Sequence, residues 1–477
     1  MGRTTVHRRR LAVAVQAVLV ATAPATAGAA VLEFDPWVSA AIGYLNNIEL
    51  NPDGEPQSSD FVGEAQVGFK ALYRAQRGSG GVGYRWRGLN YLEEDQYDSG
   101  YHNLDASGQL VAVPDLLYLQ GNVFYGQVLV DPAAAPGFSN YFSSQNLQDA
   151  WGWSATPMLE RDFGRMTLTA SYTYGEWNYL NQPPSSPSED STNKTAYVSL
   201  GSSDTEQQVT VRTFYQSTRT EYESYLPYRY DKAGVDTGWA LNRDWRLVAE
   251  YGLESDLTED VIDGGLESPY WYGGFVYHPN ERNRLELRVG ERFFGNSYLF
   301  RLEHRARFVV LSASYSEDPT TYANTRAAPP SGAPPGGIPE LPDFPGYTDS
   351  RTEPYLSRLW QGSIRLEGQR TQVVLSYYDD NQEYFDTGRN VTNRTSLFQV
   401  TRELSSSTSL NVWYTHRDSR DDPDYHTRDW VFAGRLSHEM ARKLTLELEA
   451  AVQSTRQQDY SDTAQGWWLG LRARKEF

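Results

Sequence analysis

The sequence contains no cysteine, and apolar residues are scarce for its length. Without cysteine there is no disulfide framework, no thiol nucleophile and no thiolate metal site. Hydrophobic residues make up 39% of the 477 residues, and the mean hydropathy is −0.61. Acidic residues (61) outnumber lysine and arginine (43), which leaves a net charge of −18. Because so acidic a surface repels phosphate, no nucleic-acid partner is expected.

The chain also lacks a run of eighteen apolar residues, so no transmembrane helix is predicted. It is nevertheless rich in aromatic residues, with 33 Tyr, 18 Phe and 13 Trp. Disordered chains are poor in these residues, so the low hydropathy does not indicate disorder. A chain that is polar on average and crowded with aromatics suits a wide membrane barrel. In such a barrel only the lipid-facing half of each strand is apolar.

The N-terminus has the pattern of a secretory signal peptide. Residues 1–10 are basic, residues 11–22 are apolar, and residues 27–30 are small. This pattern predicts a signal peptide over residues 1–30 and a mature domain over residues 31–477. Because no cysteine follows, a lipoprotein anchor is excluded. An exported chain without a membrane-spanning helix is expected to enter the bacterial outer membrane as strands.

Apolar and polar residues alternate with a period of two through most of the chain, which predicts strands rather than helices. About twenty-two such runs lie between Phe34 and Phe477, within a range of about 18–24. The sequence therefore predicts an all-β fold, a single closed antiparallel transmembrane barrel. Strands begin within a few residues of the expected cleavage site, so no N-terminal plug domain and no TonB-dependent transporter is expected. One clear run alternates Leu444, Leu446, Leu448, Ala450 and Val452 with Thr445, Glu447, Glu449 and Ala451.

The connections between these runs alternate in length. Outer-membrane barrels have short periplasmic turns and longer external loops, and this parity matches that arrangement. The proline-rich stretch at 318–352 is accordingly predicted to be one long external loop, although such a stretch can also link two domains. Short turns follow the even-numbered runs at residues 114–115, 161–164, 242–244, 279–283, 368–370 and 440–442. Long links follow the odd-numbered runs at residues 47–60, 131–148, 178–193, 255–267 and 318–352, and residues 293–297 are a short exception.

The C-terminus alternates Trp467, Leu469, Leu471 and Ala473 and ends at Phe477. It resembles the terminal strand of outer-membrane barrels, whose final aromatic residue is the signal that the barrel-assembly machinery recognises. Phe477 is therefore predicted to be the assembly signal. Lys475 departs from the usual apolar residue at its position, and a lysine at the membrane rim can extend its amine into water.

A second resemblance covers residues 294–298 (FGNSY), 302–307 (LEHRAR) and 311–318 (LSASYSED). This stretch looks like a strand–turn–strand signature in a family of outer-membrane proteins associated with the PEP-CTERM/exosortase protein-sorting system. More loosely, the chain resembles β-barrel porins of Gram-negative bacteria. Members of the first family tend to occur beside exopolysaccharide biosynthesis and export. The resemblance implies a porin-like barrel, with polysaccharide and periplasmic export components as partners.

No catalytic, cofactor-binding or metal-binding residue is predicted. The seven histidines form no HExxH or HxH motif, and no GxSxG occurs. The acidic stretch between His416 and His426 lacks the glycine and terminal glutamate of an EF-hand and is expected to be a solvated loop. Glu447 and Glu449 share one strand face, as a glycosidase pair would, but they are predicted to line a pore.

Six charged residues are predicted to face the barrel interior as pore lining. They could form a constriction with segregated charges, or they could form salt bridges that stiffen the wall. Both alternatives stay open at this stage. These residues are Arg212, Glu286, Arg288, Arg365, Glu447 and Glu449.

The expected function is passage of exopolysaccharide or other solutes through the outer membrane. The alternative is a non-conducting scaffold for an envelope assembly, and an outer-membrane hydrolase is a distant third. Outer-membrane lipid and lipopolysaccharide are expected to surround the barrel. Aromatic rings near strand ends are expected to form membrane girdles, whereas rings on the inner face could stack on sugars. The residues assigned to girdles are Tyr174, Trp177, Tyr179, Tyr315, Tyr377, Tyr378 and Tyr414.

Overall fold

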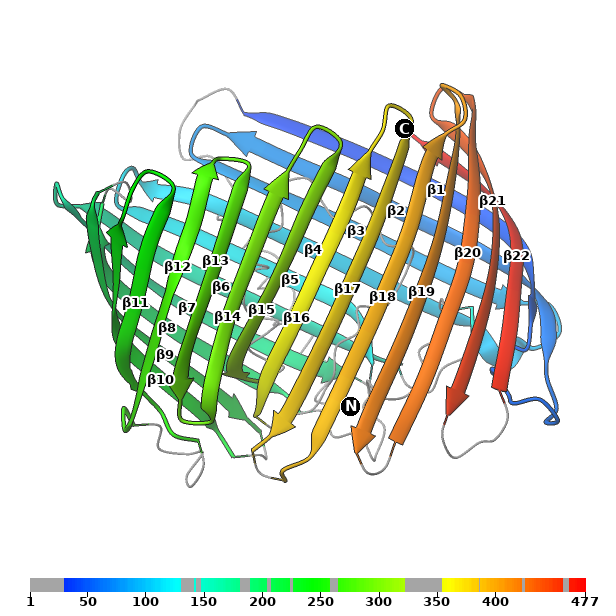
Figure 1. The fold of residues 1–477 in the computed structure, drawn as a ribbon. Coiled ribbons are helices and arrows are strands. Elements are labelled where there is room, and N and C mark those ends of the chain that lie inside the picture. Colours follow the sequence, from blue (N-terminus) through cyan, green and yellow to red (C-terminus); the bar gives the residue numbers. More distant parts are fainter. Residues whose placement is uncertain are drawn as a thin grey trace.

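The computed structural model is a single closed barrel of 22 antiparallel strands (Figure 1). It describes residues 30–129, 141–142, 147–180, 189–203, 207–223, 226–257, 265–321, 354–385, 387–422, 425–457 and 463–477. Each strand pairs with the next, and β22 pairs with β1 to close the ring. The predicted fold class and strand number are therefore confirmed.

The first eleven strands are β1 (Val31–Asn46), β2 (Ser59–Ala75), β3 (Gly78–Tyr91), β4 (Ser99–Val113), β5 (Leu117–Leu129), β6 (Leu147–Asp162), β7 (Met166–Leu180), β8 (Ser191–Ser202), β9 (Val209–Tyr222), β10 (Tyr228–Ala240) and β11 (Trp245–Glu254). The remaining strands are β12 (Ser268–Asn280), β13 (Asn283–Arg292), β14 (Gly295–Arg305), β15 (Val309–Thr320), β16 (Tyr355–Glu367), β17 (Thr371–Tyr384), β18 (Asn390–Glu403), β19 (Thr408–Asp422), β20 (Tyr425–Ala441), β21 (Leu444–Gln457) and β22 (Thr463–Glu476). One short 3₁₀ turn, η1 (Asp95–Tyr97), lies between β3 and β4. Within the described part of the chain, no helix is long and apolar enough to cross a membrane.

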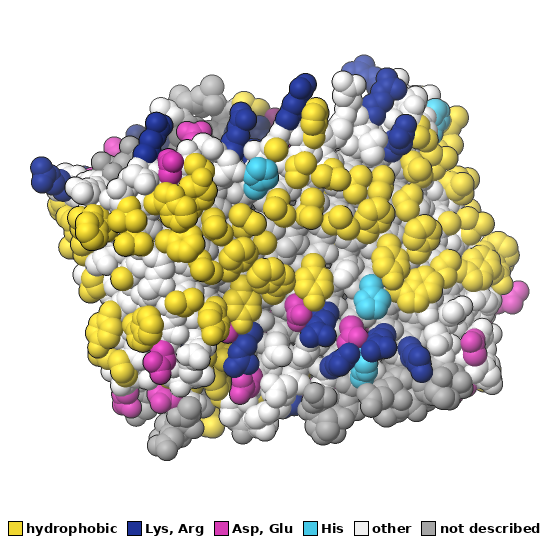
Figure 2. Space-filling view, viewed as in Figure 1, with side chains coloured by type: hydrophobic (Ala, Val, Ile, Leu, Met, Phe, Trp, Pro, Cys, Tyr) yellow, Lys and Arg dark blue, Asp and Glu magenta, His cyan; other side chains and the backbone are white. Residues whose placement is uncertain are grey.

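The alternation in the sequence separates the two faces of the wall. On β21, Leu448 is 48% exposed on the outer face, while the neighbouring Glu449 is 7% exposed and faces inward. β22 shows the same contrast between the exposed Trp467 and the buried Trp468. Figure 2 shows the outward apolar side chains as a broad band across the face in view. An apolar exterior around a polar interior is the arrangement of outer-membrane β-barrels.

The connections follow the predicted parity. Even-numbered strands are followed by short turns, such as residues 76–77 after β2 and residues 281–282 after β12. Most odd-numbered strands are followed by longer links, although those after β13 and β19 are also short. Chain direction alternates, so the long links gather at one end of the barrel, here called the external end. β1 begins and β22 ends at the opposite end of the barrel.

Two sequence assignments lie wholly or partly outside the described residues. The predicted signal peptide is outside except for Ala30, and β1 begins at Val31. β15 continues to Thr320, so the predicted long loop begins later than residue 318, and residues 322–353 are not described. The stretch at 294–318 does form a strand–turn–strand unit, β14 and β15 with a turn at residues 306–308.

The C-terminal strand takes part in ring closure. β22 pairs with both β21 and β1, and the backbone N–H of Phe477 donates a hydrogen bond to the Pro36 carbonyl at 3.0 Å. The Lys475 amine donates to the carbonyl of Arg442 in the β20–β21 turn at 3.0 Å. Lys475 thus reaches the polar rim, as its position at the strand end requires.

Connecting segments contribute side chains to the barrel interior. Tyr141 and Phe142, between β5 and β6, are each 2% exposed and pack in a cluster with Leu45, Val62 and Trp468. The Tyr141 ring stacks on Trp468 with centroids 4.1 Å apart. Among the residues that the structure describes, no separate plug domain fills the barrel.

Candidate functional site

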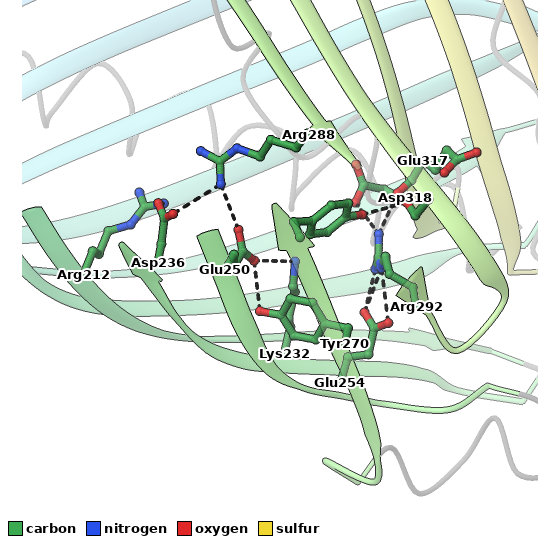
Figure 3. A network of polar contacts seen from close by, with 12 residues as sticks. Arg212, Lys232, Asp236, Glu250, Glu254, Tyr270, Arg288, Arg292, Glu317 and Asp318 are labelled. Carbon is green, nitrogen blue, oxygen red and sulfur yellow. Dashed lines mark hydrogen bonds and ion pairs between the residues drawn. The ribbon is translucent and has the colours of Figure 1, made fainter. Parts of the chain in front are cut away.

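The inner wall over β9–β13 carries two neighbouring groups of ion pairs (Figure 3). Arg288 on β13 is the centre of the first group. Its guanidinium lies 3.2 Å from Asp236 on β10, 3.3 Å from Glu250 on β11 and 2.8 Å from Glu286 on its own strand. Arg212 on β9 extends the network by pairing with Asp236 at 2.9 Å. Strand pairing brings these groups together, because Arg212 lies directly opposite Asp236 and Asp236 lies opposite Glu250.

Toward the external end, Arg292 on β13 forms a more deeply buried centre. Its side chain is 1% exposed, and it lies 2.7 Å from the fully buried Glu254. The same guanidinium donates to the Tyr230 hydroxyl at 2.7 Å and to the Glu317 carbonyl at 2.6 Å. Asp318 accepts a further contact at 3.3 Å. A buried guanidinium needs this many acceptors, because an unpaired charge in such a place costs several kcal/mol.

Lys232 on β10 belongs to the group centred on Arg288. Its amine lies 3.1 Å from Glu250 and 4.3 Å from the centroid of the Tyr270 ring. The Tyr270 hydroxyl donates to the same Glu250 carboxylate at 2.9 Å. Positive and negative side chains therefore alternate along this wall, and each neutralises its neighbours. Such a wall is polar and rigid while carrying little net charge.

A second buried network lies across β2, β3 and β22. The carboxylate of Glu64 is fully buried and lies 2.6 Å from Arg87 and 2.9 Å from Arg472. Tyr141 completes the group, since its hydroxyl donates to Glu64 at 2.5 Å and accepts from Arg472 at 3.1 Å. The Arg87 guanidinium also lies 4.4 Å from the Tyr141 ring centroid. Burial raises the pKa of Tyr141 well above its ordinary value, so the hydroxyl stays protonated and keeps donating.

All six predicted pore-lining residues lie on the inner face, and the structure divides them into three groups. Arg212, Glu286 and Arg288 belong to the β9–β13 network. Glu447 lies 3.9 Å from Arg472, and Glu449 lies 3.3 Å from Arg435, so both belong to the region of Glu64.

Arg365 is different. It alternates with the outward Ile364 and Leu366, which are 38% and 40% exposed, and it lies opposite Val310 and Val374. It forms no ion pair or hydrogen bond with any side chain in the described part of the chain. For the five paired residues, the geometry matches a salt-bridged wall more closely than a constriction with segregated charges.

Of the deeply buried charges in these two regions, Glu286 was among the predicted residues, but four others were not. Glu64, Arg87, Glu254 and Arg292 are each 4% exposed or less. A signal for Arg292 was present, since it continues the inward positions of Glu286 and Arg288 at steps of two along β13. The sequence holds no comparable signal for Tyr141, which lies in a connection rather than a strand.

The predicted aromatic girdles are correct for some residues and wrong for others. Tyr377 and Tyr414 are exposed on the outer face. Trp177, Tyr179 and Tyr378 point inward instead, because Trp177 lies opposite Gly152 and Tyr378 shares the face of the buried Asp380. Position near a strand end does not determine the face, whereas the parity of the position along the strand does.

The inward aromatics on β5 and β7 line a recess. Phe124 and Trp177 stack with ring centroids 5.4 Å apart and an interplanar angle of 16°, and Tyr179 meets Trp177 edge-on at 6.3 Å. The recess measures about 370 Å³, counted to its open mouth. Its polar lining includes the side chains of Asn122, Ser154, Ser191 and Asn193. Gly152 makes this arrangement possible, because a Cβ there would overlap the Trp177 ring.

The described residues contain no cluster of His, Asp or Glu side chains that could hold a metal ion. The acidic stretch between His416 and His426 does not form a loop throughout. Asp418 and Asp421 lie within β19, and Asp422 ends that strand, so the loop prediction is wrong for them. Asp418 lies opposite Arg428 on β20 and two residues before Arg420 on its own strand. Its carboxylate forms an ion pair with each guanidinium at 3.0 Å.

No family model matches the sequence, and no curated protein matches it. Solved structures do resemble the barrel. The ferric-catecholate import receptor Fiu of E. coli K12 has a TM-score of 0.48 and 11% identity, over 93% of this chain and 82% of that one. The siderophore receptor PirA of Acinetobacter baumannii has a TM-score of 0.45 and 9% identity, over 93% and 80%.

A variant of the ferric enterobactin receptor PfeA of Pseudomonas aeruginosa has a TM-score of 0.46 and 10% identity, over 92% of this chain and 81% of that chain. Likeness at this level assigns no cargo to this chain.

Proposed function

We propose that the protein forms a pore in the outer membrane and acts on no substrate chemically. The observation that supports this proposal most strongly is a closed barrel of 22 strands with a polar inner wall. Barrels of about sixteen to eighteen strands already leave an aqueous channel. Of the six predicted pore-lining charges, all but Arg365 form ion pairs on the wall, so hydrophilic solutes would meet a polar surface whose charges largely neutralise one another.

We further propose that the solute is saccharide-like. The recess lined by Phe124 and Trp177 joins aromatic faces to amide and hydroxyl groups. Aromatic faces suit the apolar faces of sugar rings, while the amides of Asn122 and Asn193 can exchange hydrogen bonds with sugar hydroxyls. The resemblance at residues 294–318 also supports a saccharide-like solute, because it implies a PEP-CTERM/exosortase setting with exopolysaccharide export.

A non-conducting scaffold is the second candidate, and a specific observation favours it. Tyr141 and Phe142 occupy part of the interior, and five of the six predicted pore-lining charges are committed to partners in the wall. A barrel filled in this way could serve to anchor an envelope assembly.

Single-channel conductance of the refolded full-length barrel in a planar bilayer separates the two candidates. A pore gives steady current steps that added exopolysaccharide blocks. Silence from protein shown to be folded by its heat-modifiable gel migration would favour the scaffold. Arg365→Glu tests whether ions pass through the barrel interior. It reverses a charge on the inner face that forms no ion pair with the described side chains. In a salt gradient, the reversal potential should therefore shift to the value of a more cation-selective pore.

Arg402→Glu is the matched control for this substitution. Arg402 is exposed on the outer face of β18, in step with the outward Phe398, so the same change in charge lies outside the lumen. An equal shift in both variants would contradict conduction through the interior. The same recording without polysaccharide tests the pore separately from the saccharide.

A further inference from the structure

The outer face of β18–β21 carries a basic patch near the external end of the barrel. We define this outer basic patch as Arg394, Arg420, Arg428 and Arg456, with the adjacent His416 and His426. Figure 2 shows lysine or arginine and histidine side chains gathered beneath the apolar band on this face. The patch is unexpected in a chain with a net charge of −18.

Strand register places the patch directly beyond the apolar band. Phe398, Tyr414, Phe432 and Val452 lie opposite one another on consecutive strands and form an outward apolar row. Four residues further toward the external end, Arg394, Asp418, Arg428 and Arg456 form the corresponding row. At about 3.3 Å per residue along a strand, the two rows are separated by about 13 Å. That distance takes the wall from hydrocarbon into the headgroup region.

Within the patch, the arginine side chains stay open to solvent beside the carboxylates that the structure describes. Asp418 lies 3.0 Å from both Arg420 and Arg428, and Arg394 pairs with Asp379 at 3.0 Å. Their guanidiniums nevertheless remain 43–52% exposed. Among the described residues, Arg394 and Arg428 each form an ion pair with one carboxylate, and Arg456 forms none.

The pairing of Arg428 with Arg456 is the decisive feature. The two lie directly opposite each other on β20 and β21 and face outward. Like charges in this position destabilise a sheet unless a counter-ion lies between them. Among the residues that the structure describes, Arg456 forms no ion pair, and Arg428 forms one, with Asp418. An external anion against this pair would supply a counter-ion to both guanidiniums.

We infer that the outer basic patch binds the phosphate groups of lipid A, the lipopolysaccharide anchor in the outer leaflet. Lipid A presents phosphorylated sugars at the depth of the patch, with acyl chains beside the apolar row. Arginine suits this role, because its planar guanidinium binds phosphate through two parallel hydrogen bonds. Bound phosphate would also relieve the repulsion between Arg428 and Arg456.

Lipid A binding to the detergent-solubilised full-length barrel tests this inference by native mass spectrometry. The probes are bisphosphorylated lipid A, the same lipid without its phosphates, and phosphatidylglycerol. The unmodified protein should prefer bisphosphorylated lipid A. Arg428→Gln with Arg456→Gln should weaken that binding about tenfold or more, the equivalent of one lost charge-assisted hydrogen bond. Binding of the dephosphorylated lipid should not change.

The matched control replaces Arg402 and Arg442 by glutamine, which removes the same charge at the opposite rim, where both residues are exposed. Equal weakening in both double variants would overturn the inference, because it would show a general charge effect. Equal binding of phosphatidylglycerol would overturn the assignment to lipid A. Heat-modifiable gel migration verifies folding. If the double variant does not fold, Arg456→Gln alone serves, since Arg456 forms no ion pair with the residues that the structure describes.

Discussion

Replacing Glu64 by glutamine should destabilise the barrel more than any comparable change in an exposed ion pair. Glu64 is fully buried, and its carboxylate holds Arg87 at 2.6 Å, Arg472 at 2.9 Å and the Tyr141 hydroxyl at 2.5 Å. Glutamine keeps the shape and removes the charge, so the Arg87 side chain, which is 3% exposed, loses its counter-ion. Breaking a buried pair from one side costs about 3–5 kcal/mol.

Glu33→Gln is the matched control, because it makes the same chemical change in a pair that is open to water. Glu33 and Arg74 are 3.9 Å apart, and their side chains are 48% and 67% exposed. An exposed pair of this kind contributes about 0–1 kcal/mol. The difference between the two variants should therefore be about 2–5 kcal/mol.

Reversible urea unfolding in lipid vesicles, followed by tryptophan fluorescence, measures the free energy of unfolding of each variant. Adding Arg87→Met to Glu64→Gln should recover part of the loss, since a buried pair replaced by apolar groups is often neutral in stability. A Glu64→Gln variant within about 1 kcal/mol of Glu33→Gln would refute this reasoning. It would mean that water reaches Glu64 and that the network contributes little.

Three further outcomes are expected. Gly152→Val should displace the Trp177 ring, at a cost of about 1–3 kcal/mol in stability, and should weaken block of the current by oligosaccharide; unchanged block would remove the recess from the solute path. Replacing Tyr141 and Phe142 by alanine should raise single-channel conductance, because two large side chains leave the interior; an unchanged value would place the conducting path elsewhere. Phe477→Ser should lower the heat-modifiable fraction in outer-membrane preparations, and normal assembly would contradict its role as the signal.

Local patterns in the sequence determined the strands and their faces. Alternation with a period of two decides which side chains leave a sheet on the same side, so Glu447 and Glu449 could be placed on the inner face from sequence alone. Counting the alternating runs indicated the number of strands, and the alternation of short and long connections indicated that the long links gather at one end. Both signals lie within a few residues of the positions they describe, and tertiary contacts were not needed to interpret them.

Only the tertiary structure decided which charges meet. Tyr141 and Arg472 are separated by 331 positions along the chain, yet they share a hydrogen bond at 3.1 Å. Ring closure and strand register produce that contact, and neither is encoded within a single run. The structure likewise showed Trp177 inside the barrel and Arg428 facing Arg456, because cross-strand partners depend on register. The sequence could therefore predict a polar lumen, while the pairing of its charges depended on the closed barrel.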